Sequence, residues 1–155
     1  MSASPGPRRL VVPPGALGER PYRVVFVCTG NICRSPMAEV ITRSIAASTE
    51  LGDHTTLGDH LDVASAGTGP WHEGEPMHEL ASEALARAGY PRHPHLAHQV
   101  VSSQLGQIDL VVALDRRHQQ TLRAEEHRVG WHPQRTRTAQ VEAHVGVGAG
   151  KQLPA

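Results

Sequence analysis

The stretch YRVVFVCTGNICRSPMAEVITRSIAAS, residues 22–48, sets the pattern on which the rest of the chain is built. It opens with a short apolar run rich in β-branched residues, 22–28, which predicts a strand buried on both faces of a parallel sheet. After a polar loop, residues 36–48 place apolar side chains at helical spacing and predict a helix. Pro36 suits the first turn of that helix, and Ser35 suits its N-cap.

The same alternation recurs along the chain. Residues 61–67 and 108–114 read as two more buried strands, and residues 77–90 as a helix with an apolar stripe. Asp115 stands where the N-cap of a third helix belongs. This order predicts an α/β fold, a small parallel sheet with helices on both faces. Ligands of such sheets bind beyond the carboxyl ends of the strands, where the loop after residue 28, the segment 65–72 and Asp115 all lie.

Length and composition set limits on the class of protein. The 155 residues have room for one domain, and Lys+Arg and Asp+Glu are both 15, so charge gives no reason to expect a nucleic-acid or anionic-membrane partner. No apolar stretch reaches the roughly 18–20 residues of a membrane-spanning helix. With two cysteines and no recognisable export signal, we expect a cytoplasmic protein. We expect a disordered extension over 1–21, the domain over 22–127 and a disordered tail over 128–155.

The loop VCTGNICRSP, residues 27–36, has the features of an anion site. Where a strand turns into a helix, successive backbone N–H groups can point at one centre, and the helix N-terminus adds its positive dipole end. Gly30 lets the backbone approach a ligand closely, and Asn31 tolerates a left-handed turn. The planar fork of Arg34 matches two oxygens of a phosphate.

Cys28 stands at the mouth of this loop. The same N–H groups and Arg34 favour its thiolate, and Ser35 can donate a hydrogen bond to it. The spacing therefore predicts phosphoryl transfer onto sulfur, followed by hydrolysis of the thiophosphate. The competing interpretation makes Cys28 a core residue and Arg34 a surface charge, but it leaves the glycine, asparagine and serine of the same turn unexplained.

These residues carry a family resemblance. VVFVCTGNICRSPMAE resembles the active-site signature of the low-molecular-weight protein tyrosine phosphatases of the bacterial, actinobacterial type. The resemblance continues through SAGTGPWHEGEP and residues 95–100 to VVALDRRH, and it covers about Arg23 to Leu122. It implies a Rossmann-like three-layer fold, the phosphotyrosine phosphatase I fold, acting on phosphotyrosine-containing proteins, with no cofactor and no metal.

The resemblance also implies roles for single residues. Cys28 would be the nucleophile and Arg34 the phosphate clamp, while Cys33 could pair with Cys28 and protect it from over-oxidation. Trp71 falls where the family places an aromatic wall against the substrate ring, and Ile32 favours tyrosine over arginine phosphatases, which typically carry Thr there. The implied phosphate-binding loop consists of Thr29, Gly30, Asn31, Ile32, Cys33 and Ser35, and the implied loop-supporting residues are Ser65 and His95.

The general acid of the family has no counterpart in this sequence. In the family it is an aspartate of a late D-P-[YFW] loop, followed by a long final helix, but this chain has no Asp after Asp115. An acid matters because the leaving phenolate has a pKa near ~10. We expect the last strand and helix of the fold to be missing as well. Our hypothesis is that a frameshift replaced this part, which resequencing the gene would test.

Three functions follow. The first is a protein tyrosine phosphatase impaired in its acid step. The second is a non-catalytic phosphate-binding remnant, a pseudophosphatase. The third, ranked last, is an arsenate reductase, because that chemistry generally uses three cysteines and this chain has two. Asp115 as a stand-in acid is a further alternative, although its N-cap role already accounts for it.

Overall fold

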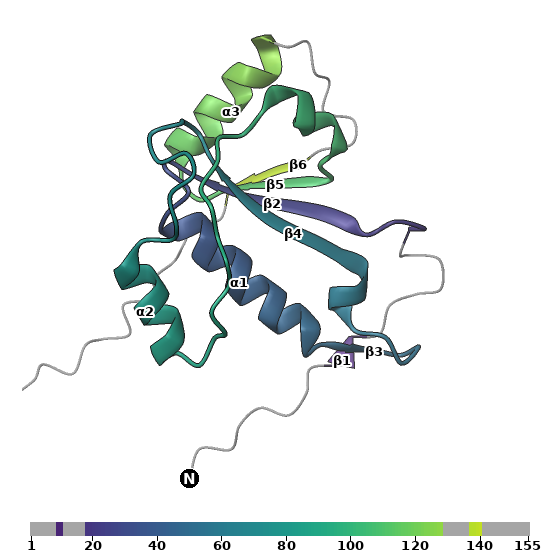
Figure 1. Cartoon of the computed structure of the whole chain (residues 1–155). Helices are drawn as coiled ribbons and strands as arrows, with labels where there is room; N and C mark the ends of the chain where they lie inside the picture. Colours follow the sequence, from purple (N-terminus) through teal and green to yellow (C-terminus); the bar gives the residue numbers. More distant parts are fainter. Residues whose placement is uncertain (1–8, 11–17, 129–136, 141–155) are drawn as a thin grey trace, which may run out of the picture.

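The structure is a computed structural model that describes the backbone of residues 9–10, 18–128 and 137–140, and the side chains of 18–128. Its centre is a parallel sheet in the order β4-β2-β5-β6 (Figure 1). The strands are β2 (Tyr22–Cys28), β4 (Leu61–Gly67), β5 (Leu110–Ala113) and β6 (Arg137–Gln140). The first three match the predicted strands, with β5 shorter than the predicted 108–114.

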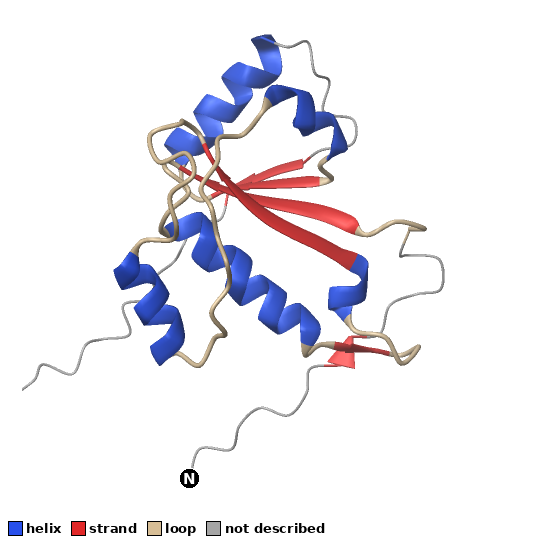
Figure 2. Cartoon of the chain, viewed as in Figure 1, coloured by secondary structure: helices blue, strands red, loops and turns tan. Residues whose placement is uncertain are grey.

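Helices cover both faces of the sheet, as predicted (Figure 2). On one side lie α1 (Arg34–Ala47) and α2 (Glu79–Arg87), and on the other lie α3 (Arg116–Arg128) and the 3-10 helix η2 (Ser102–Gln107). Between the sheet and the second pair, a buried apolar cluster fills the interior. It consists of Val25, Val27, Ala66, Leu105, Ile108, Val111, Ala113 and Leu122. The α/β fold with helices on both faces is therefore confirmed.

Two parts of the sequence prediction were wrong in detail. The helix predicted over 36–48 begins at Arg34, with Cys33 at its N-cap, so Ser35 is not the cap. The reason is the left-handed turn at Asn31, with φ of 58°, which lets the chain enter the helix early. Pro36 still falls in the first turn, where its missing N–H leaves no hydrogen bond unmade.

The prediction that the last strand is missing was also wrong. Backbone pairing of Leu110–Ala113 with Arg137–Gln140 adds β6 in parallel to the free edge of β5. The sequence RTAQ does not alternate apolar and polar residues, so no side-chain pattern predicts a strand there. The strand forms because the edge of β5 offers unpaired backbone N–H and C=O groups. The predicted absence of the last helix concerns residues 141–155, which lie outside the described residues.

The termini bear on the predicted domain boundaries. Within the extension predicted to be disordered, the backbone of β1 (Arg9–Leu10) pairs in parallel with β3 (Glu50–Leu51), the segment that precedes the 3-10 helix η1 (Leu57–His60). The rest of the predicted tail and extension, residues 1–8, 11–17, 129–136 and 141–155, lies outside the described part. The domain boundaries stay a prediction. Of the helices that the structure describes, none has the length and apolar character needed to cross a membrane.

Candidate active site

The loop after β2 forms the floor of a pocket of about 360 Å³ at the carboxyl end of the sheet. This is the place that the parallel topology predicts for a ligand. The lining residues come from two segments, the loop itself and the turn after β4. They are Cys28, Thr29, Gly30, Ile32, Cys33, Arg34, Trp71 and His72. Four of the six predicted phosphate-binding loop residues therefore line one cavity together with Cys28 and Arg34, whereas Asn31 and Ser35 do not line it.

Cys28 is the last residue of β2, and only 3% of its surface is exposed. Its Sγ lies 3.0 Å from the Oγ of Ser35, which is fully buried in the first turn of α1. Cys33 is partly exposed on the same loop, and both cysteines are free. The strand and the helix thus bring a thiol and a hydroxyl together that are seven residues apart in the chain.

Asn31 holds the loop in shape through its side chain. Its Nδ2 donates to Ser35 Oγ at 2.9 Å and to Ser65 Oγ at 3.0 Å, and its Oδ1 accepts from the backbone N–H of His98 at 3.0 Å. The backbone carbonyl of Asn31 accepts a hydrogen bond from His95 Nε2 at 2.6 Å. Ser65 and His95, the two residues to which the resemblance gave a loop-supporting role, therefore both contact the loop through Asn31.

The direction of these hydrogen bonds is fixed by Glu39. Its carboxylate accepts from Ser65 Oγ at 2.6 Å, so Ser65 can only accept from Asn31. Ser35 likewise accepts from Asn31, which leaves its single proton for either the carbonyl of Ala66 at 3.3 Å or Cys28 Sγ. Once Cys28 is a thiolate it accepts hydrogen bonds only, and the Ser35 proton stabilises its charge.

Glu39 is a residue that sequence reasoning missed. It is 6% exposed, and it is flanked by Arg43 Nη2 at 3.0 Å and His93 Nε2 at 3.5 Å. A glutamate within a helix is most often solvated, and its burial here depends on β4 lying against α1. No local pattern in the sequence could have indicated this contact.

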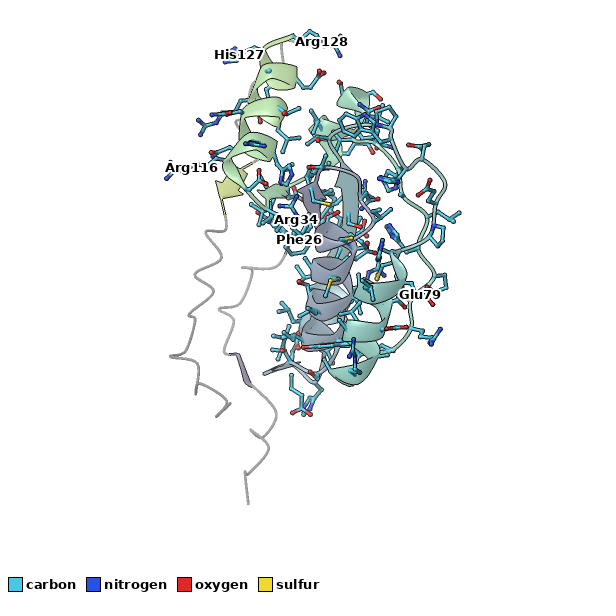
Figure 3. The ribbon with its side chains drawn as sticks, turned by 90° about the vertical axis from the view of Figure 1, so that its left-hand side faces the viewer. Phe26, Arg34, Glu79, Arg116, His127 and Arg128 are labelled. Atoms are coloured by element: carbon cyan, nitrogen blue, oxygen red, sulfur yellow. The ribbon has the colours of Figure 1, made fainter. Side chains whose placement is uncertain are left out.

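Arg34 stands at the mouth of the pocket, with about half of its side chain exposed. Arg34 is the first residue of α1, and Figure 3 shows it at that end of the helix, on the side of the molecule where α3 begins at Arg116. Its Nη1 lies 3.0 Å from Asp115 Oδ2. Partial burial raises the pKa of Asp115, but hydrogen bonds from the His118 amide and the Arg34 guanidinium outweigh it, so the carboxyl pKa lies below its usual range.

Asp115 also caps α3, as predicted, because its Oδ1 accepts from the His118 backbone N–H at 2.9 Å. The His118 side chain, which the sequence did not single out, is 2% exposed and lies behind the loop. Its Nε2 contacts Thr29 Oγ1 at 2.9 Å and Arg34 Nη2 at 3.4 Å. An arginine only donates, so Nε2 accepts and the ring is neutral with its proton on Nδ1. Burial lowers the pKa of His118, and although Asp115 opposes this, Arg34 adds to it.

Trp71 and His72 form the wall of the pocket opposite the loop. Trp71 is 66% exposed, and its ring lies against Gly69, where a side chain would meet the ring atoms. His72 lies over Gly30 in the same way, since a Cβ built at Gly30 would be 2.6 Å from His72 Cδ2. His72 Nδ1 is 2.8 Å from Glu75 Oε2. Sequence reasoning predicted Trp71 at this wall and missed His72.

Nothing in the described residues suggests a resident metal, because no three His, Cys, Asp or Glu side chains there are grouped to hold one. The arrangement is instead an anion cradle with a buried thiol beneath it. Loop N–H groups, Arg34 and the start of α1 supply positive potential, and Cys28 lies at the centre.

Comparisons with known proteins agree with this geometry. Residues 23–142 match the family described as low molecular weight phosphotyrosine protein phosphatase, a match that extends past Leu122, where we had expected the resemblance to end. The chain is 49% identical over 102 residues to a low molecular weight protein-tyrosine-phosphatase of Streptomyces coelicolor and 50% identical over 103 residues to low molecular weight protein-tyrosine phosphatase A of Mycobacterium tuberculosis. Each match covers 66% of this chain and 58% of the relative, so the chain spans somewhat more than half the length of these relatives. The crystal structure of YfkJ from Bacillus subtilis superposes with a TM-score of 0.66 at 36% identity, covering 78% of this chain and 72% of that one.

Proposed function

The chain belongs to the low molecular weight phosphotyrosine protein phosphatase family, and on that premise we propose that it hydrolyses phosphotyrosine in proteins through a cysteinyl-phosphate intermediate. The observation that carries the proposal is the buried Sγ of Cys28 at the centre of the anion cradle, 3.0 Å from Ser35 Oγ. A structural cysteine would need neither this hydroxyl nor a loop held open by Asn31.

In the first step, the Cys28 thiolate attacks the phosphorus of the bound ester. An S–P bond forms, the P–O bond to the tyrosine oxygen breaks, and that oxygen takes up a proton as it leaves. We expect the backbone N–H groups of the loop and the Arg34 guanidinium to hold the equatorial oxygens, where negative charge lies during transfer. The proton of Ser35 stabilises the thiolate before the attack.

In the second step, water attacks the phosphorus of phosphocysteine. The S–P bond breaks, inorganic phosphate forms, and the thiolate regains its hydrogen bond from Ser35 Oγ. Trp71 offers a flat apolar face for the substrate ring, and Ile32 is consistent with phosphotyrosine rather than phosphoarginine as substrate. The resemblance also supports a role for Cys33, which is free and partly exposed on the same loop: it forms a reversible disulfide with Cys28 that protects the nucleophile. Two free cysteines also fit the predicted cytoplasmic location.

A quenched-flow assay tests this function. We expect the parent protein to release phosphate from an activated aryl phosphate and to carry phosphate on Cys28 after acid quench. Cys28→Ser should remove both, while Cys33→Ser, which leaves the nucleophile in place, should retain turnover. Turnover that survives in Cys28→Ser would contradict the proposal.

A second function remains because the sequence has no Asp after Asp115. In this alternative the protein is a phosphate-binding remnant that binds phosphate or vanadate without turning over esters. Phosphate binding by the parent together with no release from any aryl phosphate would favour it. Arsenate reduction ranks last, and parallel assays with arsenate and a thiol donor separate it from both.

A further inference from the structure

His72 lines the same pocket as Cys28. The leaving oxygen departs on the side of the phosphorus opposite Cys28 Sγ, which is toward the open mouth of the pocket. His72 lines that mouth beside Trp71, and its ring covers Gly30 of the loop. Among the pocket-lining residues that the structure describes, there is no carboxylate.

The imidazole of His72 is oriented by a carboxylate. Because a carboxylate accepts hydrogen bonds, Nδ1 of His72 carries a proton and donates it to Glu75 Oε2 at 2.8 Å. Nε2 is then the ring position that exchanges protons, and within the described residues it has no hydrogen-bond partner. Histidine exchanges protons near neutral pH, which suits a group that must act as acid and then as base.

The turn that carries this pair is tied to the phosphate-binding loop. The backbone N–H of Glu75 donates to the carbonyl of His72 at 2.9 Å, which keeps the carboxylate next to the ring. Two further backbone hydrogen bonds join the turn to Ala97, from Gly74 N–H at 2.7 Å and to the Glu75 carbonyl at 2.8 Å. The segment around Ala97 also holds Asn31 through His95 and the His98 N–H. His72 and the loop are therefore parts of one hydrogen-bonded frame.

We propose that His72, oriented by Glu75, is the general acid–base residue of this site, a role that rests on the proposed phosphatase function. In the first step, Nε2–H of the imidazolium gives its proton to the tyrosine oxygen as the P–O bond breaks. In the second step, the neutral Nε2 takes a proton from the attacking water as the S–P bond breaks. The charged or titratable groups that face the ring are Glu75 and, across the pocket, Cys28, Cys33 and Arg34.

Leaving-group chemistry gives the test. For phenyl phosphate, whose phenolate is about as basic as that of tyrosine (pKa about 10), we expect His72→Asn to lower kcat by about 10²–10⁴-fold. For a dinitrophenyl phosphate, whose leaving group needs no protonation, the rate of phosphocysteine formation should stay within a factor of about two, while the hydrolysis of phosphocysteine, which uses Nε2 as base, should slow for both esters. His127→Asn, a matched change at the far end of α3 (Figure 3), should leave both rates unchanged.

Glu75→Gln separates catalysis from packing. The amide still accepts a hydrogen bond from Nδ1 and keeps the ring in place but carries no charge beside the imidazolium, so phosphocysteine formation should slow on phenyl phosphate and stay nearly unchanged on the dinitrophenyl ester. An equal loss of phosphocysteine formation on both esters in His72→Asn, or no loss of phosphocysteine formation on either, would overturn the assignment. A parent protein that releases no phosphate from the dinitrophenyl ester and forms no phosphocysteine would instead remove the phosphatase function itself, and the inference with it.

Discussion

Asn31 is the residue on which the shape of the phosphate-binding loop depends. It combines a positive φ of 58° with three side-chain hydrogen bonds and complete burial. Glycine can adopt this φ without strain, whereas alanine cannot, although neither makes the hydrogen bonds. The backbone and side-chain contributions can therefore be separated by two substitutions at one position.

We expect Asn31→Ala to be less stable than Asn31→Gly by about 1 kcal/mol, because a Cβ at positive φ costs roughly 1–2 kcal/mol, partly offset by the greater freedom of glycine in the unfolded chain. Both variants should bind phosphate weakly, since Ser35 and Ser65 lose the amide that orients them. Urea denaturation and phosphate titration measure the two effects. Equal stability of the two variants would mean that φ is not constrained.

Gly67, the last residue of β4, is limited by space rather than by φ. A Cβ there would lie 2.8 Å from the carbonyl oxygen of Thr29 and 3.3 Å from the backbone nitrogen of Asn31. Because both neighbours are backbone atoms, Gly67→Ala should move the loop and destabilise the protein by about 1–3 kcal/mol. Gly106→Ala is the matched control, since a Cβ at Gly106 meets nothing within 4 Å. Thermal unfolding should show a lowered Tm for the first variant alone.

The residues of the site differ in how visible they are in the sequence. Cys28, Asn31, Arg34 and Ser35 lie within one loop, and each suits its position for a local reason, so spacing alone predicted the cradle. Glu39, His72 and His118 act through partners that are distant in the chain or on another element. Their contacts exist only once β4, the turn after it and α3 reach the same end of the sheet.

Among the elements, α3 depends on its first residues. Asp115 caps the helix through the His118 N–H, and the same carboxylate holds Arg34. Asp115→Ala should therefore destabilise the protein by about 0.5–2 kcal/mol. Asp115→Asn retains a capping oxygen and should lose only about 0.3–1 kcal/mol, from the charge at the helix N-terminus. Urea denaturation distinguishes the two variants.

Kinetics of the same Asp115→Asn variant test whether Asp115 is the acid. An unchanged kcat on phenyl phosphate excludes it, because an amide cannot donate a proton to the leaving oxygen. We expect this result, since Asp115 pairs with Arg34 and is not among the residues that line the pocket. A large loss on phenyl phosphate with a normal rate on a dinitrophenyl ester would assign the acid to Asp115 instead.

The strands and helices could be predicted from the sequence where their burial requires a recognisable spacing of apolar residues. β2 and β4 bury most of their residues, which their β-branched and small side chains indicate, and their predicted bounds agree with the structure. The start of α1 was displaced because a single left-handed residue sets where the helix begins. β6 was missed because its residues pair with the edge of β5 through backbone hydrogen bonds. These hydrogen bonds do not depend on which side chains the strand carries, so they leave no pattern in the sequence.

At the scale of the whole molecule, His118 links α3, the phosphate-binding loop and Arg34, so its protonation affects the packing of several elements at once. Burial lowers the pKa of His118 below its usual range of about 6.5, and Arg34 adds to this against the opposing effect of Asp115. The folded state therefore favours the neutral ring. Its contribution to stability is fully present above about pH 6.5 and is lost as the pH falls through the lower folded-state pKa.

We expect the free energy of unfolding of the parent protein to fall between about pH 7 and about pH 5, where carboxylates remain largely ionised. His118→Asn cannot take up the proton, so its stability should be lower at neutral pH but should change less over this interval. Urea denaturation at a series of pH values measures both curves. His127→Asn, which removes an exposed histidine from the same helix, should follow the parent. If the free energy of unfolding changed with pH in the same way for the parent and for His118→Asn, the role of His118 would be contradicted. Protonation of His118 would then cost the folded protein no stability.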